Sequence, residues 1–288
     1  MPSHDRSRPS SRIPEWLRVG LPANETFGRI RRLLQDLELN TVCQSARCPN
    51  IFDCFSRGVA TFMILGTSCT RGCTFCNIGH GPLLPPDSEE PQRIVRAVKQ
   101  LGVTHVVLTS VTRDDLADGG AGHFAACVRL LKNTSPERSV EVLIPDFKGC
   151  EASLRVVLES NPDILNHNVE TVPDLYREVR PQAAYHRSLE LLKRVKMGSD
   201  IRTKSGLMVG LGERDEQIRS VIRDLARVGC DVVTIGQYMR PSRSHPEVQR
   251  YVEPARFEVY AAWGREAGIA HMHCAPLVRS SYNAERFL

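Results

Sequence analysis

The chain has 288 residues, of which 41% are hydrophobic, and a net charge of +5 at pH 7. The apolar fraction is enough to bury a large core, and one α/β barrel can account for the whole length. No apolar run approaches the roughly 20 residues needed to span a bilayer, and charges of both signs are spread along the chain. We therefore expect no membrane association and no nucleic-acid partner.

Residues 1–13 are predicted to form a disordered tail. The first residues lack the apolar core of a secretory signal, and Asp5 and several prolines argue against a transit peptide. We therefore expect a cytoplasmic protein. In that reducing compartment the ten cysteines are not expected to form disulfides, and six of them fall between Cys43 and Cys76, which indicates metal binding.

The first three cysteines lie in a predicted N-terminal extension, residues 14–58. Cys43, Cys48 and Cys54 have the spacing C-x4-C-x5-C. One helical face does not present all three at these intervals, and Pro49 interrupts a helix. A loop wrapped around an iron–sulfur cluster is the favoured interpretation, and three buried structural cysteines are the alternative.

A second group of cysteines follows in "CTRGCTFC", residues 69–76. Closed zinc sites usually take four ligands as two C-x2-C pairs, and Cys69, Cys73 and Cys76 do not follow that pattern. Three thiolates can hold three corners of a [4Fe–4S] cube, which leaves the fourth iron to bind a small chelating molecule. We favour such a cluster over zinc, and we expect Arg71 to add positive charge beside it.

Residues 59–268 repeat a β-branched apolar run, a polar turn and an amphipathic stretch. Six such units predict a parallel sheet in a partial (β/α)6 TIM-type barrel, with N-terminal and C-terminal extensions. The polar clusters follow the strands, so one site is expected at their carboxyl ends. The apolar runs are residues 59–65, 104–109, 140–144, 163–168, 205–210 and 231–236.

The remaining polar and cysteine positions are given structural roles. We expect Asp114, Asp115 and Asp118 to serve helix starts and caps. Cys127, Cys150 and Cys230 are expected to be core or helix-end thiols. The C-terminal segment, residues 269–288, opens with "HMHC", which we interpret as a late strand rather than a metal site.

The C-x3-C-x2-C spacing, with Phe75 before the last cysteine, resembles the signature of radical S-adenosylmethionine enzymes. The resemblance implies a full or partial barrel. It also implies that the open iron chelates the amino and carboxylate groups of S-adenosylmethionine. One electron then cleaves the carbon–sulfur bond, and the resulting 5′-deoxyadenosyl radical abstracts hydrogen from an unactivated carbon. Hydrogen-atom abstraction needs no acid or base, so no such catalytic pair is expected.

Two cysteine trios in this order, with "NHNVETVPDLYREVRP" and the ending "PLVRSSYNA", resemble the lipoyl synthase family over about residues 14–284. The resemblance implies that Ser281 is the fourth ligand of the second cluster, held by Cys43, Cys48 and Cys54, with Arg279 nearby. It implies insertion of two sulfur atoms, taken from that cluster, at C6 and C8 of a protein-bound octanoyl-lysine.

The same resemblance implies the partners of the protein. The carriers are lipoyl domains of 2-oxoacid dehydrogenases and the H protein of glycine cleavage, and ferredoxin or flavodoxin supplies electrons. A monomer is the default expectation. Two alternatives stay open: another sulfur-inserting enzyme, such as a biotin synthase or methylthiotransferase-like protein, and a non-catalytic iron–sulfur or zinc sensor.

Contacts to S-adenosylmethionine are expected at strand ends. Each of these residues has the alternative of being an ordinary loop polar or packing residue. We place Phe75 and Ile78 at the adenine, Thr109 and Ser110 at the methionine amino group, Asn168 and Glu170 at the ribose, and Arg180 or Lys204 at the methionine carboxylate.

Overall fold

The computed structural model describes residues 13–20, 25–57 and 60–287. The predicted tail therefore lies almost wholly outside the described residues. The sheet has eight strands in chain order, with β1 antiparallel to β2 and the others parallel. They are β1 (Asn40–Thr41), β2 (Thr61–Ile64), β3 (His105–Ser110), β4 (Ser139–Leu143), β5 (Ile164–Asn166), β6 (Arg202–Val209), β7 (Val232–Gln237) and β8 (His271–Cys274).

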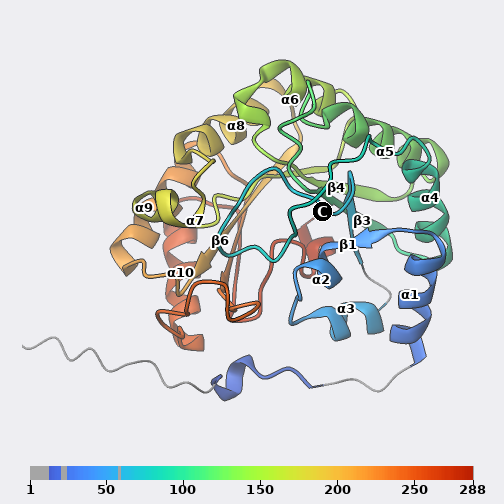
Figure 1. Ribbon diagram of the computed structural model, residues 1–288. Coiled ribbons are helices and arrows are strands. Elements are labelled where there is room, and N and C mark those ends of the chain that lie inside the picture. The colour runs from blue at the N-terminus through green and yellow to red at the C-terminus, as the bar shows by residue number, and fades with distance from the viewer. Residues whose placement is uncertain (1–12, 21–24, 58–59, 288) are drawn as a thin grey trace, which may run out of the picture.

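Helices cover the outer, convex side of this curved sheet (Figure 1). The barrel is open, because β1 and β8 form the two ends of the strand order within the described part of the chain. The helices are α1 (Glu25–Asp36), α2 (Val42–Ser45), α3 (Ile51–Ser56), α4 (Glu90–Leu101), α5 (Ala121–Thr134), α6 (Glu151–Leu158), α7 (Tyr176–Val179), α8 (Tyr185–Gly198), α9 (Asp215–Arg227) and α10 (Pro254–Glu266).

The predicted partial barrel is confirmed, and each of the six predicted apolar runs overlaps a strand, β2 to β7. Helix α4 begins with Pro91 in its first turn and ends at Gly102, whose φ of 64° suits a residue without Cβ. The predicted late strand is β8, which pairs with β7 and so belongs to the sheet. Strand β1 was missed, because a two-residue strand carries no periodic signal.

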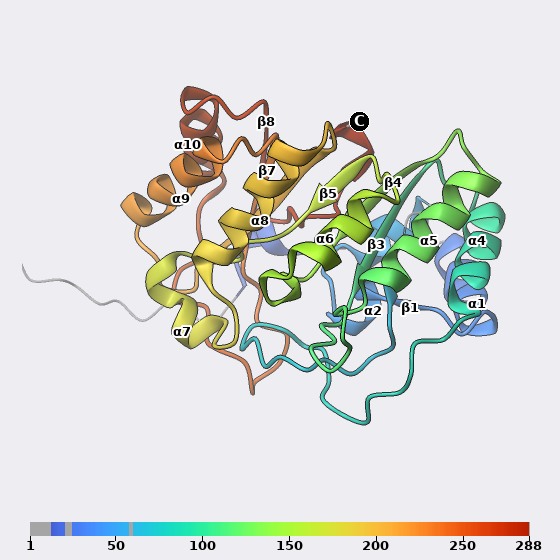
Figure 2. The same ribbon diagram turned by 90° about the horizontal axis from the view of Figure 1, so that it is seen from above.

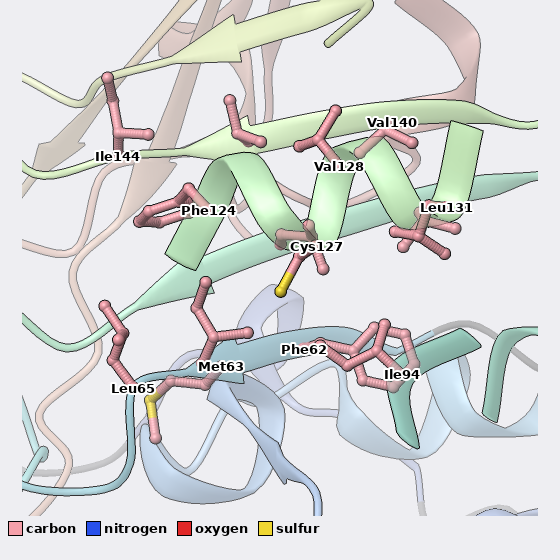
Figure 3. Packing of buried hydrophobic residues seen from close by; sticks show 14 of the residues in the cluster. Phe62, Met63, Leu65, Ile94, Phe124, Cys127, Val128, Leu131, Val140 and Ile144 are labelled. Atoms are coloured by element: carbon pink, nitrogen blue, oxygen red, sulfur yellow. The ribbon is translucent and has the colours of Figure 1, made fainter. Parts of the chain in front are cut away.

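The largest core cluster lies between α5 and the strands β2 to β4 (Figure 3). Phe124, Cys127 and Leu131 recur at helical spacing and point toward the sheet. Burying a side chain such as Phe124 contributes roughly 1.5–3 kcal/mol. Cys127 and Cys230 are buried core thiols and Cys150 is an exposed thiol at the N-cap of α6, in line with the expected core or helix-end positions. In the ranges that the structure describes, no helix has both the length and the apolar character to cross a membrane.

The C-terminal segment runs along the inside of the barrel. Phe287 packs against Ile164 and Val232, which begin β5 and β7, and Arg202 hydrogen-bonds the carbonyl of Phe287. The C-terminus therefore lies at the opposite end of the strands from the loop after β2 (Figure 2). One segment thus connects the two ends of the barrel.

Candidate functional site

One cavity of about 350 Å³ lies at the carboxyl ends of the strands. This volume is in the range of small-molecule sites. Both cysteine trios line it, together with segments from the two ends of the chain. The predicted site residues in its wall are Cys43, Cys48, Cys54, Cys69, Cys73, Phe75, Cys76, Ile78, Thr109, Ser110, Asn168, Glu170, Arg180, Arg279 and Ser281.

The loop trio directly follows β2. The amide of Cys69 donates to the carbonyl of Gly79 at 3.0 Å, and the amide of Cys76 donates to the carbonyl of Cys73 at 3.0 Å, so the loop folds back on itself. Burial, with the neighbouring thiols, raises the pKa of Cys76 to about 12. Binding of a metal cluster must therefore displace the proton of the Cys76 thiol.

The second trio is spread over α2 and α3. The amide of Cys48 donates to the carbonyl of Cys43 at 3.0 Å, and Cys54 lies one turn beyond the helix start at Asn50. Burial raises the pKa of Cys43 to about 11, with Cys48 adding to the shift. Burial raises the pKa of Cys54 to about 12, with Cys43 and Cys48 adding to the shift.

The C-terminal segment is tied to this second trio. The side-chain amide of Asn50 donates to the carbonyl of Leu277 at 2.7 Å, and the hydroxyl of Tyr282 donates to Asp53 at 3.1 Å. Ser281 lies between these two ties in the sequence and lines the same cavity as the trio. Sequence positions more than 200 residues apart thus share one wall of the cavity.

Arg279 is half-buried and lines the cavity together with Cys48 and Glu170. Burial lowers the pKa of Arg279, while the nearby Cys48 and Glu170 favour the charged form. Its expected position beside a second cluster stays a prediction.

The donor sets fit iron–sulfur cubes. Each trio presents three thiols to the wall of one cavity, and three thiolates can hold three of the four irons of a cube. The chemistry of the donors, soft sulfur alone in each trio, also suits iron and sulfide.

Seven of the eight residues expected at S-adenosylmethionine line the cavity. Asn168 and Glu170 hydrogen-bond each other at 3.0 Å, and Arg180 donates to the carbonyl of Asn168 at 3.0 Å. In the described chain, Ser110 Oγ, Asn168 Oδ1 and Arg180 Nε are buried without a hydrogen-bond partner. Buried polar atoms are normally satisfied, so this wall suits a polar ligand.

The eighth, Lys204, lies elsewhere, and its expected role is corrected. Its side chain is fully buried, its ammonium binds Glu141 at 3.0 Å, and it sits 5.1 Å from the ring of Phe287. Lys204 comes early in β6, so it points into the barrel below the cavity. Arg180 is then the remaining candidate for a carboxylate.

The expected role of the Arg71 charge is also corrected. The guanidinium binds Asp114 and Asp146 and is not free beside the thiols. Asp115 pairs with Arg113 instead of capping a helix. Asp118 does serve the helix start, since its carboxylate accepts from the amides of residues 120 and 122 at the beginning of α5. The sequence shows such ion pairs only as separated charges.

The fold and the cysteine loop define a class of enzyme. The model of the radical SAM superfamily matches residues 63–236. Methylornithine synthase shares the fold at 16% identity, with a TM-score of 0.55 over 89% of this chain and 84% of that one. Coproporphyrinogen III oxidase from Escherichia coli, described as a radical SAM enzyme, gives 13% identity and a TM-score of 0.51 over 72% of this chain and 52% of that one. The chain belongs to the radical SAM superfamily.

Within that superfamily the match is narrower. A model of the N-terminal domain of lipoyl synthase matches residues 3–48. Lipoyl synthase from Oleidesulfovibrio alaskensis is 58% identical over 100% of this chain and 99% of its own length. That from Nitratidesulfovibrio vulgaris strain Hildenborough is 60% identical over 99% of this chain and 95% of its own length. The chain belongs to the lipoyl synthase family.

Family membership confirms the resemblance seen in the sequence. It sets aside a biotin synthase or methylthiotransferase-like protein and a non-catalytic sensor. It also implies S-adenosylmethionine and two [4Fe–4S] clusters as cofactors.

Proposed function

We propose that this chain inserts two sulfur atoms, at C6 and C8, into an octanoyl chain carried on a lysine of another protein. One observation carries this proposal: both cysteine trios and Ser281 line a single cavity. A source of sulfur and a source of radicals must reach the same fatty chain. A shared cavity meets that requirement.

We assign the loop trio, Cys69, Cys73 and Cys76, to the cluster that binds S-adenosylmethionine. Together these cofactors supply the one-electron chemistry that removes hydrogen from an unactivated carbon. The protein positions them. Phe75 and Ile78 offer apolar surface beside the loop, and the polar wall offers the partners that an amino acid and a ribose need.

The residues of the polar wall are each assigned to one part of S-adenosylmethionine. Arg180 is fixed by the carbonyl of Asn168 and by the Tyr176 hydroxyl, and its Nε is left for an anionic group such as the methionine carboxylate. Asn168 and Glu170 remain for the ribose hydroxyls. Burial raises the pKa of Glu170, with Arg180 opposing that shift. Thr109 and Ser110, at the end of β3, remain for the methionine amino group.

We assign Cys43, Cys48, Cys54 and Ser281 to the second cluster, which gives up sulfur. A serine oxygen is a hard donor among soft thiolates, so its corner is the weakest and the first to open. The Asn50 and Tyr282 contacts keep the serine in reach. Arg279 offsets negative charge on that side of the cavity.

The partners follow from the substrate. The acyl-lysine is presented by lipoyl domains of 2-oxoacid dehydrogenases or by the H protein, and ferredoxin or flavodoxin supplies the electrons. The exposed Arg47 lines the cavity and donates to the carbonyl of Pro241, so it offers one cation to an approaching carrier. A cytoplasmic location and a monomeric state stay predictions.

The test uses anaerobically reconstituted, reduced protein with S-adenosylmethionine and an octanoyl-lysyl peptide. We expect about two 5′-deoxyadenosine per product and a peptide heavier by two sulfur atoms, in line with two hydrogen abstractions. Formation of 5′-deoxyadenosine without sulfur transfer would keep the radical chemistry and contradict the lipoyl assignment.

Ser281→Ala tests the serine oxygen as a cluster ligand, because it removes only that oxygen. It should stop sulfur transfer and leave cleavage of S-adenosylmethionine intact. Ser280→Ala is the matched control, because Ser280 Oγ only accepts a 3.3 Å hydrogen bond from Asn168. Equal sulfur transfer by the two variants would remove Ser281 from the cluster.

A further inference from the structure

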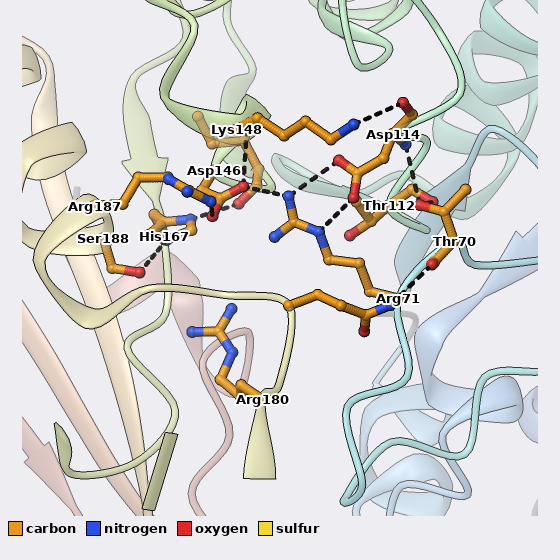
Figure 4. Close-up of polar contacts among 12 residues, drawn as sticks. Thr70, Arg71, Thr112, Asp114, Asp146, Lys148, His167, Arg180, Arg187 and Ser188 are labelled. Carbon is orange, nitrogen blue, oxygen red and sulfur yellow. Dashed lines mark hydrogen bonds and ion pairs between the residues drawn. The ribbon is translucent and has the colours of Figure 1, made fainter. Parts of the chain in front are cut away.

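Arg71 lies between Cys69 and Cys73 in the sequence, and its guanidinium points toward the carboxylates of Asp114 and Asp146 (Figure 4). Only 4% of the side chain is exposed. Its Nε and Nη2 donate to Asp114 at 2.7 and 3.0 Å, and Nη2 also donates to Asp146 at 2.5 Å. The planar fork of arginine matches this bidentate arrangement, which an ammonium does not reproduce.

The two carboxylates are themselves fixed by separate loops. Asp114 follows β3, and Asp146 follows β4. Asp146 accepts from the amide of Lys148 at 3.0 Å and pairs with Arg187 at 3.1 Å. The amide of Asp114 donates to Thr70 at 3.0 Å. Arg71 thus joins the cysteine loop to the ends of two neighbouring strands.

The residues on either side of Arg71 are held too. The amide and the hydroxyl of Thr70 both donate to the carbonyl of Thr112 at 3.0 Å. The amide of Gly72 donates to Gln182 at 2.7 Å. Three consecutive residues between two of the cysteines are therefore anchored to three different loops.

The positive charge of Arg71 is balanced by the carboxylates of this network and is not directed at the cluster. Arg71 contacts both Asp114 and Asp146, and Asp146 in turn pairs with Arg187 at 3.1 Å. The cation is therefore committed to holding the loop.

We propose that Arg71 is a positioning residue, whose fork on Asp114 and Asp146 holds the loop so that Cys69, Cys73 and Cys76 keep the spacing a cluster requires. This inference rests on the proposed assignment of the loop trio to a cluster. Outer partners that orient metal ligands affect metal retention by about 10- to 100-fold. The same range is expected here.

The experiment measures release of iron to a chelator from the anaerobically reconstituted full chain. In Arg71→Met the loop-held irons should leave about 10- to 100-fold faster, and the change that S-adenosylmethionine induces in the electron paramagnetic resonance signal should disappear. The irons of the second trio should leave at the wild-type rate. Arg71→Lys should behave like Arg71→Met, because it keeps the charge and loses the fork.

Arg113→Met is the matched control. Its side chain is 3% exposed and pairs with Asp115 on the same loop as Asp114, but it makes no contact with residues 69–76 among the described hydrogen bonds and ion pairs. It should keep the wild-type rate of iron release even where its melting temperature falls as far as that of Arg71→Met. Equal release from the two variants would overturn the proposal.

Two further outcomes are decisive. Full recovery in Arg71→Lys would show that charge alone matters and would overturn the positioning role. If Arg71→Met does not fold, Asp114→Asn takes its place, and a wild-type release rate in that variant overturns the proposal. Absence of a loop-held cluster in the wild-type chain would instead contradict the proposed function.

Discussion

The two cysteine trios share one cavity but are supported in different ways. The loop trio lies within eight residues and is anchored by buried charged groups from the ends of β3 and β4. The second trio spreads over α2 and α3 and is tied to the C-terminal segment, partly through ion pairs of Arg57 that lie at the surface. The two trios are therefore held by different surroundings, or frames. The first frame consists of the buried ion pairs around the loop trio, and the second consists of the contacts between the second trio and the C-terminal segment.

This difference fits the two proposed roles. A cluster that returns unchanged after each turnover benefits from ligands that stay in place. A cluster that gives up sulfur must be opened and rebuilt, so part of its frame must release at low cost. Two hydrogen bonds between this region and the C-terminal segment, from Asn50 to the carbonyl of Leu277 and from Tyr282 to Asp53, provide such a frame.

The largest effects come from removing the thiols themselves. Cys73→Ala should abolish both 5′-deoxyadenosine and product, because the cluster that binds S-adenosylmethionine is lost. Cys48→Ala should abolish product alone. Each variant should keep about four of the roughly eight irons expected for two cubes. Iron analysis and product quantification check both, and loss of 5′-deoxyadenosine in Cys48→Ala would contradict the division of roles.

The next effect concerns the passage of the C-terminal segment past β7. A Cβ on Gly236 would lie 2.0 Å from the carbonyl oxygen of Val278, which is backbone and has no rotamer to change. Gly236→Ala should therefore cost about 3 kcal/mol, the upper part of the usual range for overpacking. It should also reduce sulfur transfer more than S-adenosylmethionine cleavage, because Ser281 moves with the segment.

Gly28→Ala is the control for that variant. Gly28 lies within α1, and a Cβ there meets no atom within 4 Å. Alanine favours helices over glycine by up to about 1 kcal/mol, so this change should be neutral or stabilising. Urea unfolding of both variants measures the difference, and equal stability of the two would show that the C-terminal segment adapts freely.

The local parts of this structure were readable from the sequence. The alternation of apolar runs, polar turns and amphipathic stretches predicted the six repeated units, because each signal depends on neighbouring residues only. The cysteine spacings indicated clusters for the same reason. The association of Ser281 with Cys43, Cys48 and Cys54 came from the family resemblance, since nothing local connects residues so far apart.

The pairing of the buried charges could not be predicted from the sequence. Lys204 was expected at the ligand, and Arg71 was expected at the cluster, but each is committed to a carboxylate on another strand or loop. Which carboxylate a cation meets depends on strand register and on the exact residue at which a strand ends. Sequence patterns fix those boundaries only to within a few residues.

A smaller effect is expected on the pH dependence of stability, through a buried histidine beside Asp146. His167 lies behind Asp146, with its Nδ1–H donating to the carbonyl of Ile144 at 2.9 Å and its Nε2 accepting from Ser188 at 2.9 Å. Burial, with Arg180 as the next cause, lowers the pKa of His167 from 6.5 to about 4. Between these values the unfolded chain binds a proton that the folded chain does not, so stability falls as pH falls.

From pH 7 to pH 5 this residue alone should lower the free energy of unfolding by about 2 kcal/mol. His167→Gln should remove that part of the pH dependence, whereas His186→Gln, at an exposed position, should leave it unchanged. Denaturant unfolding at the two pH values gives the comparison. A wild-type slope in His167→Gln would show that other groups control acid sensitivity.

The smallest effect is expected at the surface of the second frame. Arg57 pairs with Asp53 at 2.9 Å and with Glu285 at 3.8 Å, and its side chain is 38% exposed. Exposed pairs contribute about 0.2–1 kcal/mol and weaken with salt, whereas breaking a buried pair costs about 3–5 kcal/mol. Arg57→Ala should therefore cost less than about 1 kcal/mol, and the loss should shrink at high salt. A loss as large as that of Arg71→Met would show that both trios are held equally firmly, and the contrast between a rigid and a releasable frame would not stand.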